Sequence, residues 1–259
     1  MKHFSGLIYM VKTACLWLRL NCRRFRVGGD DCAWPEVVRQ VQEYLPERHC
    51  GPNESNHCTI GLMTHALHRA HRCILVIAMT YAISLGIGIL MVHGGSEFAL
   101  SYRDSLVARA HRDDPASRAN DAGQHLRAAV IDFSRNLFMA AIPETIGGLT
   151  LVLPIGLAAY RGWVGGIVSV GQYHQSRLTQ LWPATYYLTT LLLQVTAFTL
   201  AAGGGLHLGW ATLRGRGPFI GPGWFRLSRL ALVDVAQLYA IAVPLFAIGA
   251  LWEFCLPPA

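Results

Sequence analysis

The stretch FMAAIPETIGGLTLVLPIG, residues 138–156, has the apolar character of a membrane span, but Pro143 and Glu144 interrupt it. An ionised carboxylate at the centre of a bilayer costs at least ~2.5 kcal/mol, even on the most lenient insertion scales. Proline adds to the disturbance because it frees a backbone carbonyl one turn earlier. The stretch therefore predicts a membrane helix in which Glu144 needs either a polar partner or a place near the headgroups.

The composition of the whole chain agrees with a membrane location. Of its 259 residues, 53% are hydrophobic and only 14% are charged, whereas a soluble domain carries about 25% charged residues. A helix needs about 20 apolar residues to cross a hydrocarbon core of roughly 30 Å. Four stretches reach that length, at residues 73–92, 137–159, 186–208 and 230–256. The sequence thus predicts an all-α, polytopic membrane helix bundle.

A shorter apolar run raises the predicted number of crossings to about five. GWVGGIVSVG (162–171) covers only about 15 Å as a helix and continues into the polar segment QYHQSR (172–177). Basic loops stay in the cytoplasm, and the chain has ten Lys and Arg before residue 73 and four Arg with no acid between residues 209 and 229. Both basic segments lie inside only if one more crossing, short or broken, falls between residues 160 and 184. This places the N-terminus in the cytoplasm of a bacterial inner membrane and the C-terminus outside.

We expect the chain to have two parts. Residues 1–72 are interpreted as a cytoplasmic or interfacial extension, because residues 4–24 carry apolar and basic side chains on opposite helical faces, as helices lying in the headgroup region do. Residues 73–259 form the membrane domain, whose loop 94–136 is expected outside the cytoplasm as helices divided at Asp113-Asp114-Pro115. Within residues 49–58, two His-Cys pairs have the ligand types of a zinc site, but adjacent side chains rarely both reach one ion, so metal binding there is the less favoured interpretation.

Glycines in the second half of the chain have spacings that favour helix contact. Gly162 and Gly166 are four residues apart, as are Gly205 and Gly209, and Gly148 follows another glycine. Small residues let helix backbones approach closely in a membrane, where lipid offers no hydrophobic driving force between helices. We therefore predict that these glycines pack helices together.

Only three acids follow residue 136, namely Glu144, Asp234 and Glu253, and all lie in or beside apolar stretches. We predict an intramembrane polar cluster around Glu144, and Arg161 is a further candidate partner. The predicted members of this cluster are Glu144, His174, Gln175, Arg177 and Gln194. The alternative is that Glu144 lies near the outer headgroups, protonated or hydrated.

Several of these residues stand where a known family has its motifs. Asn136, Ala140 and Gly148 enter the second apolar stretch, and Arg161-Gly162 with Gly166 matches an Asn-Gly-x-x-x-Gly turn. QVTAFTLAAGGGLHLG (194–209) is similar to a Glu-Leu-Pro-Ala segment that runs into Ala-Gly-Leu-Arg-Leu-Gly. Over residues 70–259 the chain resembles the stage II sporulation protein M family.

The resemblance implies a five-helix inner-membrane protein with its N-terminus in the cytoplasm. It also implies a role, because sporulating members are the membrane component of a complex with cell-wall hydrolases that drives engulfment. Gln194 stands where many members have Glu, and His207 where they have Arg. Since an amide does not titrate, proton-linked chemistry at residue 194 is not expected, whereas hydrogen bonding between helices is retained.

Two functions from different classes remain open. The first is a non-enzymatic membrane scaffold or assembly subunit of a multiprotein complex, and the second is a small-solute or ion permease with a polar path near Glu144 and the broken third segment. No catalytic motif stands in the apolar stretches, so we expect no enzymatic activity and no cofactor. The expected partners are membrane lipids, other membrane or envelope proteins and a second copy of the chain, and not nucleic acid.

Overall fold

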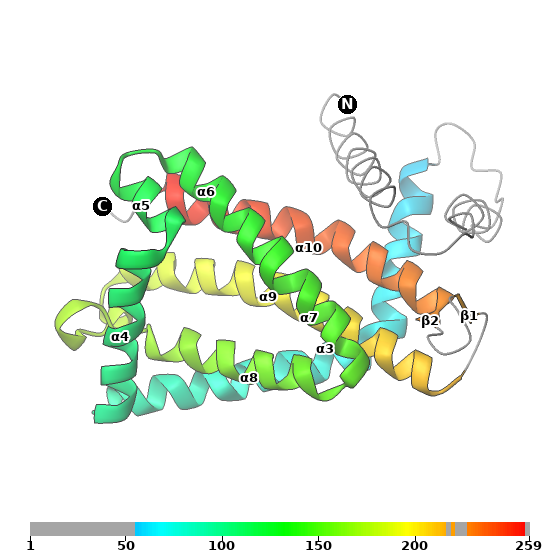
Figure 1. The fold of residues 1–259 in the computed structure, drawn as a ribbon, viewed down its shortest axis with the longest axis horizontal. Coiled ribbons are helices and arrows are strands. Elements are labelled where there is room, and N and C mark those ends of the chain that lie inside the picture. Colours follow the sequence, from blue (N-terminus) through cyan, green and yellow to red (C-terminus); the bar gives the residue numbers. More distant parts are fainter. Residues whose placement is uncertain (1–54, 216–218, 221–226, 257–259) are drawn as a thin grey trace, which may run out of the picture. The chain divides into compact units, whose positions relative to one another are not determined.

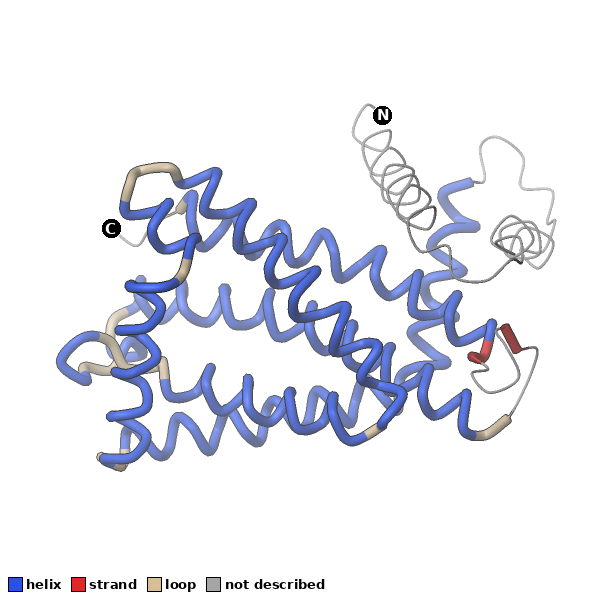
Figure 2. Tube along the Cα trace, in the orientation of Figure 1, coloured by secondary structure: helices blue, strands red, loops and turns tan. Residues whose placement is uncertain are grey.

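Three long helices dominate the fold (Figures 1 and 2). The computed structural model describes residues 55–215, 219–220 and 227–256, and all statements below concern these residues. Three of the described helices are long and apolar enough to cross a membrane: α3 (Ser55–His93), α9 (Leu181–Leu213) and α10 (Arg229–Cys255). They contain the predicted spans 73–92, 186–208 and 230–256.

Three shorter helices follow α3: α4 (Glu97–Asp113), α5 (Pro115–Asp121) and α6 (His125–Ser134). The division predicted at Asp113-Asp114-Pro115 is confirmed. Pro115 is the first residue of α5, and the Asp114 side chain caps this helix by accepting from the Ala116 backbone N–H at 3.2 Å. Proline suits the first turn of a helix because the backbone N–H that proline lacks would have no intrahelical partner at that position.

The helical arm that begins with α6 continues without a break through η1 (Arg135–Ala141) and α7 (Ile142–Gly147). The segment η1 is a π-helix and ends two residues before Pro143 of the opening stretch. In an α-helix, the ring of Pro143 conflicts with the carbonyl of Met139, four residues earlier. The wider turn of η1 covers that position, so the arm passes the proline and carries Glu144 into the bundle.

The chain then reverses, and this corrects the predicted span 137–159. A single turn of 3-10 helix, η2 (Gly148–Thr150), and a positive φ of 60° at Leu151 separate α7 from α8 (Val152–Ile167). The predicted span is therefore divided between two helices that run in opposite directions. The short run predicted at 162–171 belongs partly to α8, which has 16 residues and a length of about 24 Å.

The remaining elements lie at the two ends of the bundle. Two short 3-10 turns, η3 (Gln172–His174) and η4 (Arg177–Thr179), connect α8 to α9, and the antiparallel pair of β1 (Phe219–Ile220) and β2 (Leu227–Ser228) precedes α10. We call the end that holds residues 94–124 and 168–180 the loop end, and the end that holds the 148–151 turn and the β-pair the hairpin end; they lie at left and right in Figure 1.

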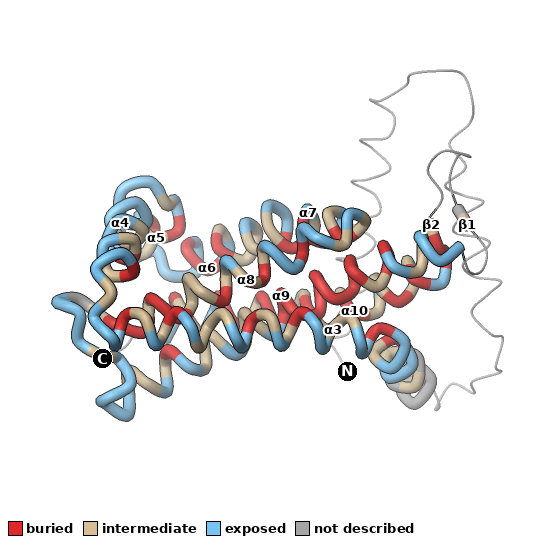
Figure 3. Tube along the Cα trace, turned by 90° about the horizontal axis from the view of Figure 1, so that it is seen from below, coloured by how far each residue is buried: buried red, intermediate tan, exposed pale blue. Residues whose placement is uncertain are grey.

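Helix α9 is the centre of the bundle. Of its most apolar window, 61% is buried, against 17% in α3 and 28% in α10, and Figure 3 shows the buried residues concentrated along it. A Cβ placed on Gly203 would lie 2.8 Å from the Ile74 Cα of α3, and one on Gly204 would lie 3.1 Å from the Leu238 side chain of α10. Successive helical residues point about 100° apart. Gly203 and Gly204 of α9 therefore lie against two different helices, α3 and α10.

The glycines predicted for packing all lie at close helix contacts. A Cβ on Gly148 would lie 2.1 Å from the Gly205 carbonyl carbon, and one on Gly209 would lie 2.2 Å from the Gly148 oxygen. On α8, a Cβ on Gly162 would lie 2.7 Å from the Tyr81 oxygen, and one on Gly166 would meet the Leu85 oxygen at 2.3 Å. No larger residue fits these contacts unless the helices move apart.

Some predictions fall outside the described residues or cut across an element. The amphipathic segment expected at residues 4–24, and residues 49–54 of the His-Cys segment, lie outside the described residues. The chain divides into the units Met1–Ser55 and Asn56–Ala259, so the expected boundary after residue 72 falls inside the continuous helix α3.

We predict that Gly205→Ala destabilises the bundle. The added Cβ would lie 2.5 Å from the Thr145 carbonyl oxygen, which belongs to the backbone of α7 and does not rotate away. Overpacking of this kind costs about 1–3 kcal/mol, and thermal unfolding in detergent, followed by circular dichroism, measures it. The matched control is Gly156→Ala on α8, where nothing lies within 4 Å; equal melting temperatures for the two variants would contradict the close packing.

Candidate functional site

The carboxylate of Glu144 is buried and paired. Its residue is only 1% exposed, and Arg161 of α8 donates from Nη1 to Oε2 of Glu144. The reversal at residues 148–151 produces this contact, because it folds α8 back along α7. The partner of Glu144 therefore belongs to α8, which forms a helical hairpin with α7, and not to the polar segment 172–177.

Side chains from three more helices surround the ion pair. The guanidinium carbon of Arg161 lies 4.0 Å from the centre of the Phe198 ring of α9, a cation–π geometry. Phe198 in turn packs edge to face on Phe246 of α10, with ring centroids 4.8 Å apart. Tyr81 of α3 is 2% exposed and interacts electrostatically with both Glu144 and Arg161. Helices α3, α7, α8, α9 and α10 thus converge on one pair of charges.

Thr145, the next residue, ties α7 to α9 and α10. Its Oγ1 lies 3.0 Å from the Ala201 carbonyl oxygen of α9 and 2.7 Å from the Tyr239 hydroxyl of α10. Hydroxyl contacts between helices stabilise membrane bundles because few other polar partners exist at that depth. Glu144 and Thr145 together therefore hold α7, the helix that precedes the reversal at residues 148–151, in a fixed place.

One acceptor of this site is not used. Within the described part of the chain, Oε1 of Glu144 is buried and has no hydrogen-bond partner. A buried carboxylate oxygen without a donor is costly, so this atom could accept a hydrogen bond from a small donor or take up a proton.

A second buried carboxylate joins three helices at the hairpin end. Asp234 of α10 is 1% exposed. Arg69 of α3 donates from Nε to Oδ2 at 2.9 Å and also from Nη2 to Oδ1. His207 of α9 places Nε2 3.1 Å from Oδ2. The two basic residues balance the charge of Asp234 and connect α3, α9 and α10.

A third acid, Glu253, pairs α9 with α10 nearer the loop end. Gln194 donates from Nε2 to Oε2 of Glu253 at 2.8 Å. Tyr186, two turns earlier on α9, donates its hydroxyl to the Glu253 backbone oxygen at 2.5 Å. An amide at position 194 is therefore a hydrogen-bond donor to the acid that lies opposite it.

These contacts correct the predicted polar cluster. Of its five members, Glu144 pairs with Arg161, Gln194 pairs with Glu253, and the other three lie in the 168–180 connection at the loop end. His174 binds Asp104 of α4 at 3.0 Å, the Gln175 carbonyl accepts from Gly171 at 2.7 Å, and the Arg177 backbone N–H donates to Ser169 at 2.9 Å. The prediction assumed that the third segment breaks beside Glu144, whereas the chain turns at residues 148–151 instead.

Polar contacts hold the 168–180 connection against α3 and α4. His93, at the end of α3, places Nε2 2.9 Å from the Ser176 hydroxyl. Hydrogen bonds from Arg103 and then from His174 lower the pKa of Asp104 below its ordinary value. Asp104 therefore stays ionised over a wider pH range and retains its contact with the connection.

Several participants were missed by the sequence analysis. Tyr81 and Phe198 lie in apolar runs without a distinguishing pattern, and Arg69 precedes the apolar stretch that begins at residue 73. Arg161 was not missed: it was named as a candidate partner, and it is one of only two Lys and Arg residues between 137 and 208. Among residues 55–215, 219–220 and 227–256, no three His, Cys, Asp or Glu side chains gather in a way that could hold a metal ion.

Comparison with known proteins gives one match. A family model described as "Stage II sporulation protein M" matches residues 74–257, which include every interaction described above except that of Arg69. No curated protein and no solved structure matches the chain significantly.

We predict that Arg161→Ala destabilises the protein by about 3–5 kcal/mol, because it leaves the carboxylate of Glu144 buried and unpaired. Glu144→Ala should cost less, because the side chain of Arg161 is 24% exposed. Glu144→Gln costs less, since the amide oxygen still accepts from Arg161. Unfolding in detergent measures these losses.

The control for the carboxylate is Glu97→Gln on α4, an exposed position. The double variant Glu144→Ala with Arg161→Ala should cost less than the sum of the single variants, because the two residues are in contact. Additive losses would show that the two charges do not interact.

Proposed function

Because the chain belongs to the stage II sporulation protein M family, we propose that this membrane protein is a non-enzymatic scaffold, an assembly subunit of a multiprotein membrane complex. It positions other membrane or envelope proteins through its ends. The family match and the three long apolar helices establish a membrane protein; the scaffold role is our proposal.

The observation that carries the proposal is the use of the intramembrane charges. Glu144, Asp234 and Glu253 each bind a side chain from another helix. A charge that moves a solute has to change partners during the cycle, whereas these charges fix α3, α7, α8, α9 and α10 in one arrangement. Such a bundle is suited to holding its loop end in a constant shape.

The proposed topology has five crossings, with the loop end outside the cytoplasm. Besides the three long helices, residues 125–147 are helical without a break and α8 runs back beside them, so each adds one crossing. The hairpin end then lies in the cytoplasm, together with the basic residues between 209 and 229, in accordance with the charge rule for loops.

We predict that thiol reagents added from outside label the native Cys255, which is exposed at the loop end, and fail to label Arg214→Cys at the hairpin end. Each site is tested as the single cysteine of the chain in intact cells, and a permeant reagent verifies that Arg214→Cys is reactive. Outside labelling of Arg214→Cys would reject the five-crossing topology.

The scaffold role predicts that the full chain, extracted in a gentle detergent after cross-linking, retains a defined set of membrane or envelope proteins. Charge reversal of the exposed Arg109 and Arg112 on α4 should remove part of that set, whereas Glu144→Gln should retain all of it. Quantitative mass spectrometry measures the retained proteins. If no protein is enriched over an unrelated membrane bait, the scaffold proposal is wrong.

A permease is the second candidate, favoured by the unpartnered Oε1 of Glu144. A proton-coupled path through this carboxylate requires a titratable group, and an amide does not titrate. In proteoliposomes, Glu144→Gln would then abolish proton or solute flux while the melting temperature stays near that of the unaltered chain. Absence of flux in both proteins supports the scaffold.

A further inference from the structure

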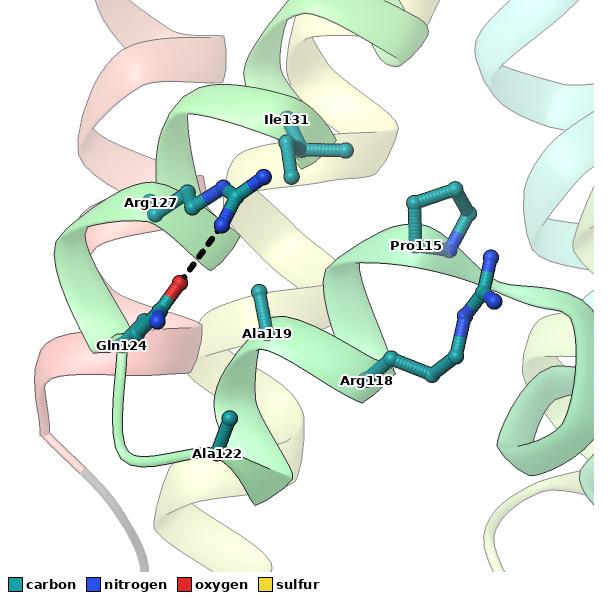
Figure 4. A pocket seen from close by; sticks show the side chains of 7 residues that line it. All are labelled: Pro115, Arg118, Ala119, Ala122, Gln124, Arg127 and Ile131. Carbon is teal, nitrogen blue, oxygen red and sulfur yellow. Dashed lines mark hydrogen bonds between the residues drawn. The ribbon is translucent and has the colours of Figure 1, made fainter.

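A pocket lies between α5 and α6 at the loop end (Figure 4). Its volume is about 300 Å³, at the lower limit of ordinary ligand pockets. Seven residues line it: Pro115, Arg118, Ala119, Ala122, Gln124, Arg127 and Ile131. Figure 4 shows the side chains of Arg118 and Arg127 on opposite sides of the apolar residues, so the pocket has a charged rim and an apolar wall.

The positive charge of this rim is not neutralised by the protein. The lining contains two arginines and no acid. Arg127 donates to the neutral Gln124 Oε1 at 2.8 Å. The Arg118 backbone N–H donates to the Asp114 carbonyl at 3.1 Å, and the Arg118 guanidinium makes no hydrogen bond or ion pair with the described residues. The neighbouring Asp114 is already engaged by Arg135 at 2.5 Å. The pocket therefore offers two guanidinium groups to an anion from outside the chain.

Exposed apolar side chains lie on the face of α6 that adjoins the pocket. Leu126 is 65% exposed and Val130 is 57% exposed; each directly precedes a pocket residue, Arg127 or Ile131, and so points about 100° away from it around the helix. Further along the arm, Phe138 and Met139 are exposed to 54% and 76%. A charged rim that passes into an exposed apolar strip is the pattern of the boundary between headgroups and acyl chains.

We infer that this pocket binds the phosphate headgroup of an anionic phospholipid, whose acyl chain lies along Leu126 and Val130. Guanidinium groups form paired hydrogen bonds with phosphate oxygens, so the two arginines favour a headgroup with a net negative charge. A free phosphate would use the two arginines and leave the apolar strip uncovered. A zwitterionic headgroup would add a cation beside the two arginines.

The test is a lipid titration of the full chain in detergent, observed by native mass spectrometry. The probes are phosphatidylglycerol, phosphatidylcholine and inorganic phosphate. We expect phosphatidylglycerol to bind at least about tenfold more tightly than phosphatidylcholine, and the double variant Arg118→Gln with Arg127→Gln to lose at least about tenfold in affinity, the scale of one charge-assisted hydrogen bond. Inorganic phosphate should not displace the lipid.

The matched control is Arg72→Gln, which removes one exposed charge from α3 outside the pocket and should leave the affinity unchanged. Because Arg118 and Arg127 are exposed, their substitution should leave the melting temperature unchanged too, so that a loss of affinity is not a loss of fold. Three results would overturn the inference: equal binding of the two lipids, an equal loss in the control, or displacement of the lipid by inorganic phosphate.

Discussion

The ion pair between Glu144 and Arg161 is the interaction on which the arrangement of the bundle depends. A lone carboxylate inside an apolar helix is expensive, and its pairing requires α7 and α8 to lie face to face. The reversal at residues 148–151 satisfies that requirement, and the stacking of Arg161 on Phe198 brings the pair against α9. Tyr81 of α3 covers the remaining side of the site. The ion pair therefore determines that the hairpin of α7 and α8 packs against α3 and α9.

The glycines of α9 allow this geometry. Gly203 receives the backbone of α3, and Gly205 receives that of α7, at distances that leave no room for a Cβ. Close backbone packing provides the dispersion contacts that replace hydrophobic driving force in lipid, while the charge pairs define which helix meets which. Contacts of both kinds resist movement, and this rigidity is the physical basis for preferring a scaffold to a transporter.

The sequence predicted the helical class, three of the spans and the role of small residues, because hydropathy and glycine spacing are local properties. It did not predict the reversal at residues 148–151. The residues on both sides of Gly148 are apolar, and mean hydropathy is the same whether a helix continues or the chain turns back. The partner of Glu144 was one of several candidates for the same reason: Arg161 becomes adjacent only after the chain has turned. Asp234 was noted as a buried acid, but its partners Arg69 and His207 lie 165 and 27 residues away along the chain, and only the folded bundle identifies them.

The most direct measurement is the distance between the Arg161 guanidinium nitrogens and the Glu144 carboxyl carbon in a lipid bilayer. Solid-state nuclear magnetic resonance with ¹⁵N-labelled arginine and ¹³C-labelled glutamate reports it through the dipolar coupling of the two nuclei. We expect a coupling typical of a direct hydrogen-bonded pair, absent from the spectrum of Arg161→Gln. A bilayer spectrum of the unaltered chain without this coupling would contradict the account, because the buried Glu144 carboxylate would then have no charged partner.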